Sequence, residues 1–295
     1  MELSAQRVEA AVLAQTRNAL RAMLALPAAR APGLAKVEDI EVAGAMGPLR
    51  ARYYEAMSPA PGPLFVYLHG GGFVCCDIDT HDSVCSWLAK GAGVRLVSVS
   101  YRLAPETPFP GQIEDARAAC AWAFANARTF GAEPERLVLC GDSAGAYLAA
   151  RMALEINAAA PGAVPLQVLF YPLIHVEDSL WADEELRNFR FLGRLAALYI
   201  ARSLGEPMPS LLDLDLSGSP TTIIAGGGPM DPVRSDVKAY AEAVQRAGAR
   251  VVERKYPVLM HGGLNFTAFS KTARDVLTHI GEAARDELVR ARSAV

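Results

Sequence analysis

From residue 63 onward, the chain alternates short apolar runs rich in β-branched residues with longer segments of helical periodicity. Strands buried on both faces of a parallel sheet have this continuous apolar character, and the helices between them cover those faces. The predicted strands are residues 64–68, 95–100, 136–140, 167–171, 221–225 and 251–256, and the predicted helices are residues 81–92, 112–129, 144–158, 233–247 and 271–292. With two further strands before residue 63, the pattern predicts an α/β fold with a mostly parallel sheet of about eight strands flanked by helices.

Two regions do not follow this alternation. Residues 1–35 include an amphipathic helical pattern, and residues 173–219 form an insertion whose length is usually a sign of function. We interpret both as helical cap elements over the carboxyl ends of the strands, where open α/β sheets bind ligands. Between residue 35 and the alternating part, residues 37–42 and 49–55 predict an antiparallel pair that opens the sheet.

The composition is that of a globular protein with a sizeable core, because 52% of the residues are hydrophobic and 21% are charged. No repeat or linker divides the chain, so residues 1–295 are predicted to form a single domain. The net charge of -3 and the scattered basic residues argue against a nucleic-acid partner. Charges in the first nine residues argue against an export signal, and no apolar run is long enough to span a membrane. We expect a soluble cytoplasmic protein with a small-molecule partner.

Residues 141–145 read Gly-Asp-Ser-Ala-Gly and lie between a predicted strand and a predicted helix. This is the context of the nucleophile elbow, a tight turn that holds a serine in a strained backbone conformation. Glycine is needed two positions before and two positions after the serine, because side chains there would collide with neighbouring elements. The motif predicts that Ser143 is a nucleophile whose hydroxyl projects at the helix N-terminus.

A glycine run at residues 69–73 follows the strand predicted at residues 64–68. Acyl transfer needs hydrogen-bond donors directed at the oxygen that becomes negative, and glycines allow bare backbone amides to approach it. We predict an oxyanion hole made by the amides of Gly70, Gly71, Gly72 and Ala144.

A serine becomes nucleophilic when a histidine removes its proton, and a carboxylate orients that histidine. His261 follows the last predicted strand and is therefore expected at the carboxyl edge of the sheet, near Ser143. The other four histidines are more simply explained as packing or surface residues: His69, His81, His175 and His279.

Asp231 follows the strand predicted at residues 221–225, so it also lies at the carboxyl edge. The chain order Ser143, Asp231, His261 is the order that α/β-hydrolases use. Asp142 is expected to point away from the histidine in the tight turn, and Asp236 is expected to be solvated. We therefore predict a triad of Ser143, His261 and Asp231.

These motifs together resemble the bacterial branch of the hormone-sensitive-lipase-like carboxylesterases. The resemblance covers residues 63–265 and rests on residues 69–73, 101–106, 141–145 and 231–234, with His261 and Gly262 after them. It implies an eight-stranded mixed sheet, a helical cap, no cofactor and no metal, a preference for short to medium acyl esters, and a homodimer. Residues 101–106 have no evident chemistry, and we interpret them as a loop braced by Arg102 and Glu106.

The predicted activity is ester hydrolysis through an acyl-enzyme, and two alternatives remain open. An amidase or deacetylase would use the same triad, and a non-catalytic ligand receptor could share the fold, as in the plant gibberellin receptors, which resemble this family but lack the histidine. The presence of His261 argues against the receptor.

The predicted substrate contacts come from residues near the glycine run and from the insertion. They are Phe73, Cys75, Cys76, Phe189 and Phe191. The chain contains five cysteines without Cys-x-x-Cys spacing, which favours reduced thiols. For Cys75 and Cys76, packing in a pocket wall is the simpler interpretation, although adjacent thiols could also have a redox role.

Overall fold

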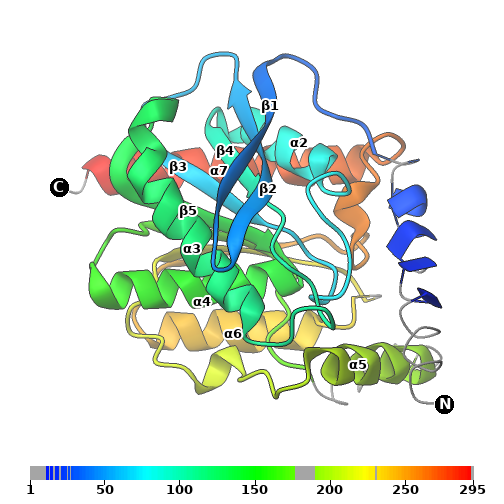
Figure 1. The fold of residues 1–295 in the computed structure, drawn as a ribbon. Helices are drawn as coiled ribbons and strands as arrows, with labels where there is room; N and C mark the ends of the chain where they lie inside the picture. Colours follow the sequence, from blue (N-terminus) through cyan, green and yellow to red (C-terminus); the bar gives the residue numbers. More distant parts are fainter. Residues whose placement is uncertain are drawn as a thin grey trace.

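The computed structural model describes residues 11–293, apart from residues 13, 16, 20, 25, 27, 177–189 and 230. Among these residues, eight strands form one sheet in the order β1-β2-β4-β3-β5-β6-β7-β8 (Figure 1). Their bounds are β1 Leu34–Gly44, β2 Gly47–Ala56, β3 Pro63–Leu68, β4 Arg95–Val99, β5 Glu133–Asp142, β6 Leu166–Phe170, β7 Thr221–Gly226 and β8 Val251–Lys255. Only β2 runs against its neighbours, since β1 and β4 pair with it in antiparallel fashion and all other pairs are parallel. The predicted α/β fold and strand number are confirmed.

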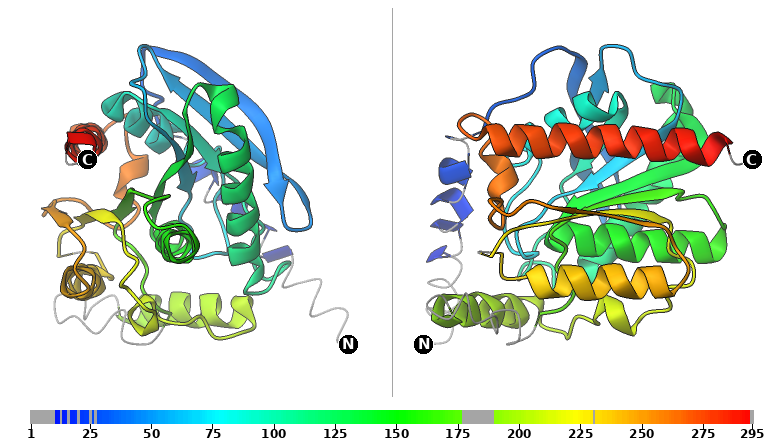
Figure 2. Two further views of the ribbon diagram at one scale, coloured as in Figure 1. Left: turned by 90° about the vertical axis from the view of Figure 1, so that its left-hand side faces the viewer. Right: turned by 180° about the vertical axis from the view of Figure 1, so that it is seen from behind.

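The helices form a layer on each face of the sheet (Figure 2). Helices α2 and α7 lie on one face, and α3, α4 and α6 lie on the other. Their bounds are α2 Asp82–Ala92, α3 Gly111–Asn126, α4 Ala144–Ala159, α6 Arg234–Arg246 and α7 Lys271–Ser293. The helix predicted at residues 112–129 is shorter than expected, because its last turn tightens into a 3-10 helix at Ala127–Phe130.

The central strands are apolar because both of their faces are covered. All six residues of β3 and all five of β6 are buried, and they belong to one continuous hydrophobic core. By contrast, β1 is largely exposed, and Val42 is its one buried residue. Because the central strands are buried on both faces, they appear in the sequence as continuous apolar runs, which made the strands after residue 63 predictable.

Two segments lie at the edge of the sheet where the parallel strands end. The helical residues between 11 and 24 and helix α5, Arg190–Leu204, both lie at the right-hand side of Figure 1, at the carboxyl ends of the strands. Arg17 Nε donates to the carbonyl of Val74 at 2.7 Å, and its guanidinium pairs with Glu106 at 2.6 Å. The N-terminal segment is thus attached to the loop that follows the glycine run.

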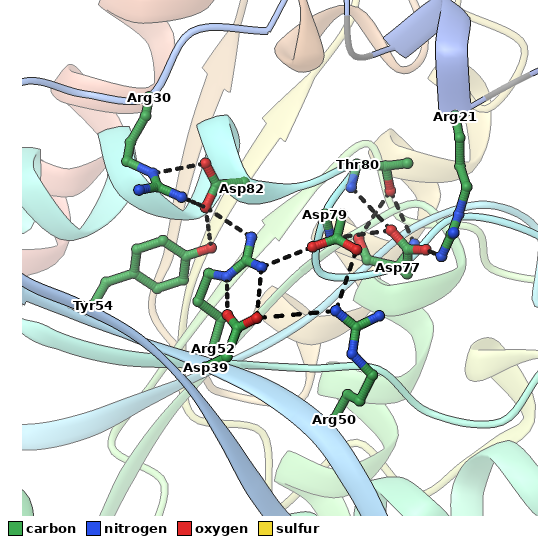
Figure 3. Close-up of polar contacts among 10 residues, drawn as sticks. All are labelled: Arg21, Arg30, Asp39, Arg50, Arg52, Tyr54, Asp77, Asp79, Thr80 and Asp82. Carbon is green, nitrogen blue, oxygen red and sulfur yellow. Dashed lines mark hydrogen bonds and ion pairs between the residues drawn. The ribbon is translucent and has the colours of Figure 1, made fainter.

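A cluster of charged side chains also holds the N-terminal segment (Figure 3). Arg52, on β2, contacts the carboxylates of Asp39, Asp79 and Asp82. Arg30 pairs with Asp82 at 2.8 Å. The remaining members of this ionic cluster are Arg21, Arg50, Tyr54, Asp77 and Thr80. The cluster connects the β1-β2 hairpin, the N-terminal segment and the loop of residues 77–82.

Two further properties bear on function. Within the part of the chain that the structure describes, no helix has both the length and the apolar character to cross a membrane. Among the same residues, no group of three or more His, Cys, Asp or Glu side chains could hold a metal ion.

Candidate active site

The turn between β5 and α4 has the geometry of a nucleophile elbow. Ser143 has a φ of 51° and a ψ of -120°, a conformation that an L-residue adopts only when its surroundings impose it. A Cβ on Gly145 would lie 2.0 Å from the carbonyl oxygen of Leu68, and one on Gly141 would lie 2.5 Å from Gly145. Helix α4 therefore lies too close to β3 for a side chain at Gly145, and too close to β5 for a side chain at Gly141.

Three side chains from separate loops form one hydrogen-bonded line at the carboxyl edge of the sheet. His261 Nε2 lies 2.9 Å from Ser143 Oγ, and His261 Nδ1 lies 3.0 Å from Asp231 Oδ1. The Asp231 side chain is fully buried, whereas 30% of the His261 side chain is exposed. The structure thus brings together all three residues that the sequence predicted as a triad.

Backbone amides hold the carboxylate of Asp231 in position. Asp231 Oδ2 accepts a hydrogen bond from Gly227 at 3.2 Å, and Oδ1 accepts one from Val233 at 3.2 Å. The ring of Tyr171 lies 4.8 Å from the His261 ring and supports it from one side. A carboxylate held in this way fixes the tautomer and the orientation of the imidazole, which is what a general base requires.

The glycine run lies beside Ser143, but its first amide is already occupied. Gly70 donates its N–H to Asp142 Oδ1 at 2.8 Å. The prediction that Gly70 contributes to an oxyanion hole is therefore wrong, since a donor bound to a buried carboxylate cannot also bind substrate. Within the described residues, the amides of Gly71, Gly72 and Ala144 donate to no protein acceptor.

Gly71 and Gly72 have backbone conformations that favour glycine, with φ values of 113° and 60°. The amide of Ala144 is the first of the α4 helix, where N–H groups lack intrahelical partners. Helix α5 lies directly against the glycine run, because a Cβ on Gly72 would be 2.7 Å from Ile200 Cδ1. These amides therefore lie between the nucleophile turn and a helix of the insertion.

A buried ion pair beneath the glycine run was not predicted. The carboxylate of Asp142 accepts hydrogen bonds from Gly70 N–H and Tyr67 Oη, both at 2.8 Å, and lies 3.2 Å from His81 Nε2. Asp142 does point away from His261, as expected, but it connects the nucleophile turn to the glycine run. No sequence pattern linked His81 to Asp142, because 61 residues separate them and only the crossover between β3 and β5 brings them together.

The surroundings of this pair favour its charged form. Burial lowers the pKa of His81, but the charge and hydrogen bond of Asp142 outweigh it and leave the pKa raised. Burial raises the pKa of Asp142, and the charge of His81 together with three hydrogen bonds outweighs it and leaves the pKa lowered. The nearby His69 behaves differently, since burial lowers its pKa to about 3 and leaves its ring neutral, stacked on Tyr101.

The residues predicted to contact substrate lie in different environments in the structure. Phe73 is fully buried and packs edge-on against Tyr147 at 5.9 Å, so it belongs to the core, and the prediction that it contacts substrate is wrong. Cys75 and Cys76 are half-buried at the end of the glycine run. Phe189 lies outside the described residues, and Phe191 belongs to α5, although the position of its side chain is not described.

The loop of residues 101–106 is braced by ion pairs to other elements. Arg102 pairs with Asp115 of α3 at 2.7 Å, and Glu106 pairs with Arg17. The interpretation of this loop as structural is consistent with those contacts. The expectation for Asp236 is wrong, because only 14% of its side chain is exposed and it lies 3.8 Å from His175.

A parallel sheet that carries a strained serine after one strand, a carboxylate after another and a histidine after the last defines the class of α/β-hydrolases. Comparison with known proteins agrees with this class. A family model described as the alpha/beta hydrolase fold matches residues 65–265, and the chain belongs to this family.

Curated relatives are esterases. Esterase LipI of Mycobacterium tuberculosis is 33% identical over 252 residues, which are 81% of this chain and 78% of the relative. The carboxylic ester hydrolase LipN of the same organism is 36% identical, with 78% of this chain and 64% of the relative covered.

Solved structures extend the similarity to almost the whole chain. The thermostable carboxylesterase EstE1 from a metagenomic library has a TM-score of 0.85 and 30% identity, with 94% of this chain and 97% of that chain covered. An esterase described as belonging to the bacterial hormone-sensitive lipase family has a TM-score of 0.79 and 27% identity, with 92% and 90% covered. The resemblance predicted from the sequence is confirmed.

Proposed function

We propose that this chain hydrolyses carboxylic esters of short to medium acyl length through Ser143, His261 and Asp231. The observation that carries the proposal is the unbroken line of hydrogen bonds from Ser143 Oγ through the imidazole to Asp231, with distances of 2.9 and 3.0 Å. The esterase names of the relatives support the same reaction.

In the proposed mechanism, His261 Nε2 takes the proton of Ser143 as its oxygen attacks the ester carbonyl. Asp231 stabilises the imidazolium that forms, and the imidazolium then gives its proton to the leaving alcohol. Water, activated by the same histidine, releases the acyl group from Ser143. Asp231 keeps its negative charge throughout, because its two oxygens already accept three hydrogen bonds.

The negative oxygen of each tetrahedral intermediate would be bound by the amides of Gly71, Gly72 and Ala144. Each such donor contributes roughly 10² to 10³ in rate. The donors are supplied by the backbone, so this step depends on the shape of the glycine run and not on any one side chain. No cofactor takes part in the proposed reaction.

We also propose that residues 1–35 and 173–219 act as a cap within a single domain. The contacts of Arg17 with Val74 and of Ile200 with Gly72 support this, because both cap segments then meet the oxyanion loop.

A relative named ethyl acetate hydrolase, from Pseudomonas putida and 29% identical, supports a short acyl group. A series of p-nitrophenyl esters of increasing chain length would test the preference, which is contradicted if long chains turn over fastest.

Replacing Ser143 by alanine tests the reaction itself. Ser143→Ala should lower kcat/KM for p-nitrophenyl esters by about 10⁴- to 10⁶-fold, because it removes the hydroxyl that His261 activates. A fluorophosphonate probe should label the wild type and not the variant. Circular dichroism and the unfolding midpoint should stay unchanged.

The matched control is Ser217→Ala, which alters an exposed serine and should keep wild-type turnover and labelling. Turnover by Ser143→Ala close to that of the wild type would contradict the assignment of Ser143 as the nucleophile. A matched p-nitroanilide should be cleaved far more slowly than the ester, and preferential cleavage of the anilide would identify an amidase instead.

A homodimer remains a prediction. Strand β8 is at the edge of the sheet, where a second copy could pair with it. Light scattering on the purified protein would test this prediction, and a monomer mass at all concentrations would contradict it.

A further inference from the structure

Two adjacent cysteines lie at the end of the glycine run with their sulfur atoms in contact. Cys75 Sγ and Cys76 Sγ are 3.8 Å apart, and both residues are half-buried. The other three cysteines are fully buried: Cys85, Cys120 and Cys140. A reagent in solution therefore meets the adjacent pair first.

The pair is tied directly to a proposed oxyanion donor. Cys75 Sγ donates to the carbonyl of Gly71 at 3.1 Å, and that carbonyl also accepts the amides of Val74 and Cys75. A Cβ on Gly71 would lie 2.2 Å from the carbonyl oxygen of Cys75 and 3.0 Å from Cys76 Cβ. Because Gly71 packs this tightly on the two cysteines, a change in their backbone must move Gly71 as well.

The pKa of the Cys75 thiol is lowered, which favours the nucleophilic thiolate. Its contact with the Cys76 thiol lowers its pKa, burial opposes this, and the charge of Arg17 adds to the lowering. Arg17 is held close by its bond to the carbonyl of Val74. A thiol with a lowered pKa, near a cation, partly exposed and next to a second thiol, has the features of a redox-sensitive cysteine.

We propose that Cys75 and Cys76 form a redox modification site that closes to a vicinal disulfide when it meets a low-molecular-weight disulfide, and that closure slows ester hydrolysis by displacing Gly71. The Cys75 thiolate attacks the incoming disulfide, and one small thiol leaves. Cys76, after losing its proton, attacks Cys75 Sγ in the resulting mixed disulfide and expels the second small thiol. Two protein thiols are oxidised and one small disulfide is reduced to two thiols.

Ring closure must change the local backbone. The sulfur atoms have to approach from 3.8 Å to about 2.05 Å. Closure also removes the S–H donor from the carbonyl of Gly71. Loss of one oxyanion donor by displacement would reduce turnover by about 10²-fold. The effect on rate rests on the proposed esterase function, whereas the covalent change does not.

The covalent change is tested by mass spectrometry. The folded protein is incubated with oxidised glutathione, the remaining thiols are blocked with iodoacetamide, and the peptide containing both cysteines is analysed. We expect this peptide to lose two hydrogen atoms and to carry neither glutathione nor the blocking group on Cys75 and Cys76. Two free thiols, or glutathione retained on either cysteine, would overturn the proposal.

Ester turnover is measured on the same samples, with each protein compared with its own reduced form. The wild type should lose about 10²-fold in kcat and regain it with dithiothreitol. Cys76→Ser should retain glutathione on Cys75, because the resolving thiol is gone. Cys120→Ala, which alters a buried cysteine of α3, should respond as the wild type does.

Ring closure with unchanged kcat would overturn the link to Gly71. A failure of the esterase proposal would give another result. Ser143→Ala would retain ester turnover, and the peptide with Cys75 and Cys76 in the wild type would still lose two hydrogen atoms.

Discussion

At the residue scale, the carboxylate beside the nucleophile has a larger role than its place in the motif indicated. Asp142 accepts the amide of Gly70, the hydroxyl of Tyr67 and a contact from His81. These bonds fix the start of the glycine run relative to Ser143. We interpret Asp142 and His81 as positioning residues, which act on the oxyanion donors through Gly70.

Replacing Asp142 by asparagine should weaken both the fold and the reaction. The Asp142→Asn substitution keeps the shape of the side chain but removes the charge that holds the buried His81 ring protonated and weakens three hydrogen bonds, which costs about 1 to 3 kcal/mol in the free energy of unfolding. We expect kcat to fall by about tenfold with little change in KM, since the donors act in the transition state. Denaturant unfolding and ester kinetics would measure the two effects.

The double variant His81→Asn with Asp142→Asn is the matched control, because it removes both charges and should recover part of the lost stability. Equal stability of Asp142→Asn and the wild type would contradict the buried ion pair.

The pair also predicts a pH dependence. The raised pKa of His81 means that its contribution to stability is fully present below pH 6.5 and is lost as the pH rises through the folded-state value. The lowered pKa of Asp142 means that its contribution is present above pH 3.8 and is lost as the pH falls. The difference in unfolding free energy between the wild type and the double variant should therefore be largest between these two values and smaller on both sides. Urea unfolding across pH would measure it, and a flat difference would contradict the prediction.

At the scale of elements, the site depends on the close approach of β3 and α4. Gly145→Ala would place a methyl group 2.0 Å from the carbonyl of Leu68 and 2.4 Å from that of His69. Because backbone atoms cannot yield as a flexible side chain can, α4 must shift away from β3. We expect a loss of about 3 kcal/mol or more in stability and loss of ester turnover.

Gly62→Ala is the control, because the nearest atom to its Cβ would be Arg292 Nη2 at 3.9 Å. Thermal unfolding and ester assays on both variants would measure the contrast. A stable, active Gly145→Ala variant would show that the elbow tolerates a wider turn.

At the scale of the whole molecule, the ionic cluster joins the β1-β2 hairpin, the N-terminal segment and the loop of residues 77–82. Arg52 is 11% exposed and contacts three carboxylates, whereas the neighbouring Arg50 is 56% exposed and contacts two. Replacing Arg52 should leave Asp82, which is 17% exposed, with one fewer compensating charge.

Arg52→Met should therefore lower the free energy of unfolding by about 1 to 3 kcal/mol. Arg50→Met, on the same strand, should cost less than about 1 kcal/mol, because an exposed ion pair is screened by water. Urea unfolding at low and high salt would compare the two. Equal effects of the two substitutions would show that burial of Arg52 adds nothing.

Much of the fold was determined by the sequence alone, because its signals are local. The apolar runs mark strands covered on both faces, and the helical periods mark the layers above and below them. The residues Ser143, Asp231 and His261 could be chosen because each follows a predicted strand, and parallel strands end at one edge of the sheet.

Only the tertiary structure decided which polar groups partner one another within that edge. The strand order brings His81 to Asp142, and that contact removes Gly70 from the set of free amides. Core packing buries Phe73, and the turn of the glycine run places Gly71 against Cys75. Such contacts join residues that are distant in the sequence. Hydrophobic periodicity does not predict them, because it shows which face of an element is covered and not which residues cover it.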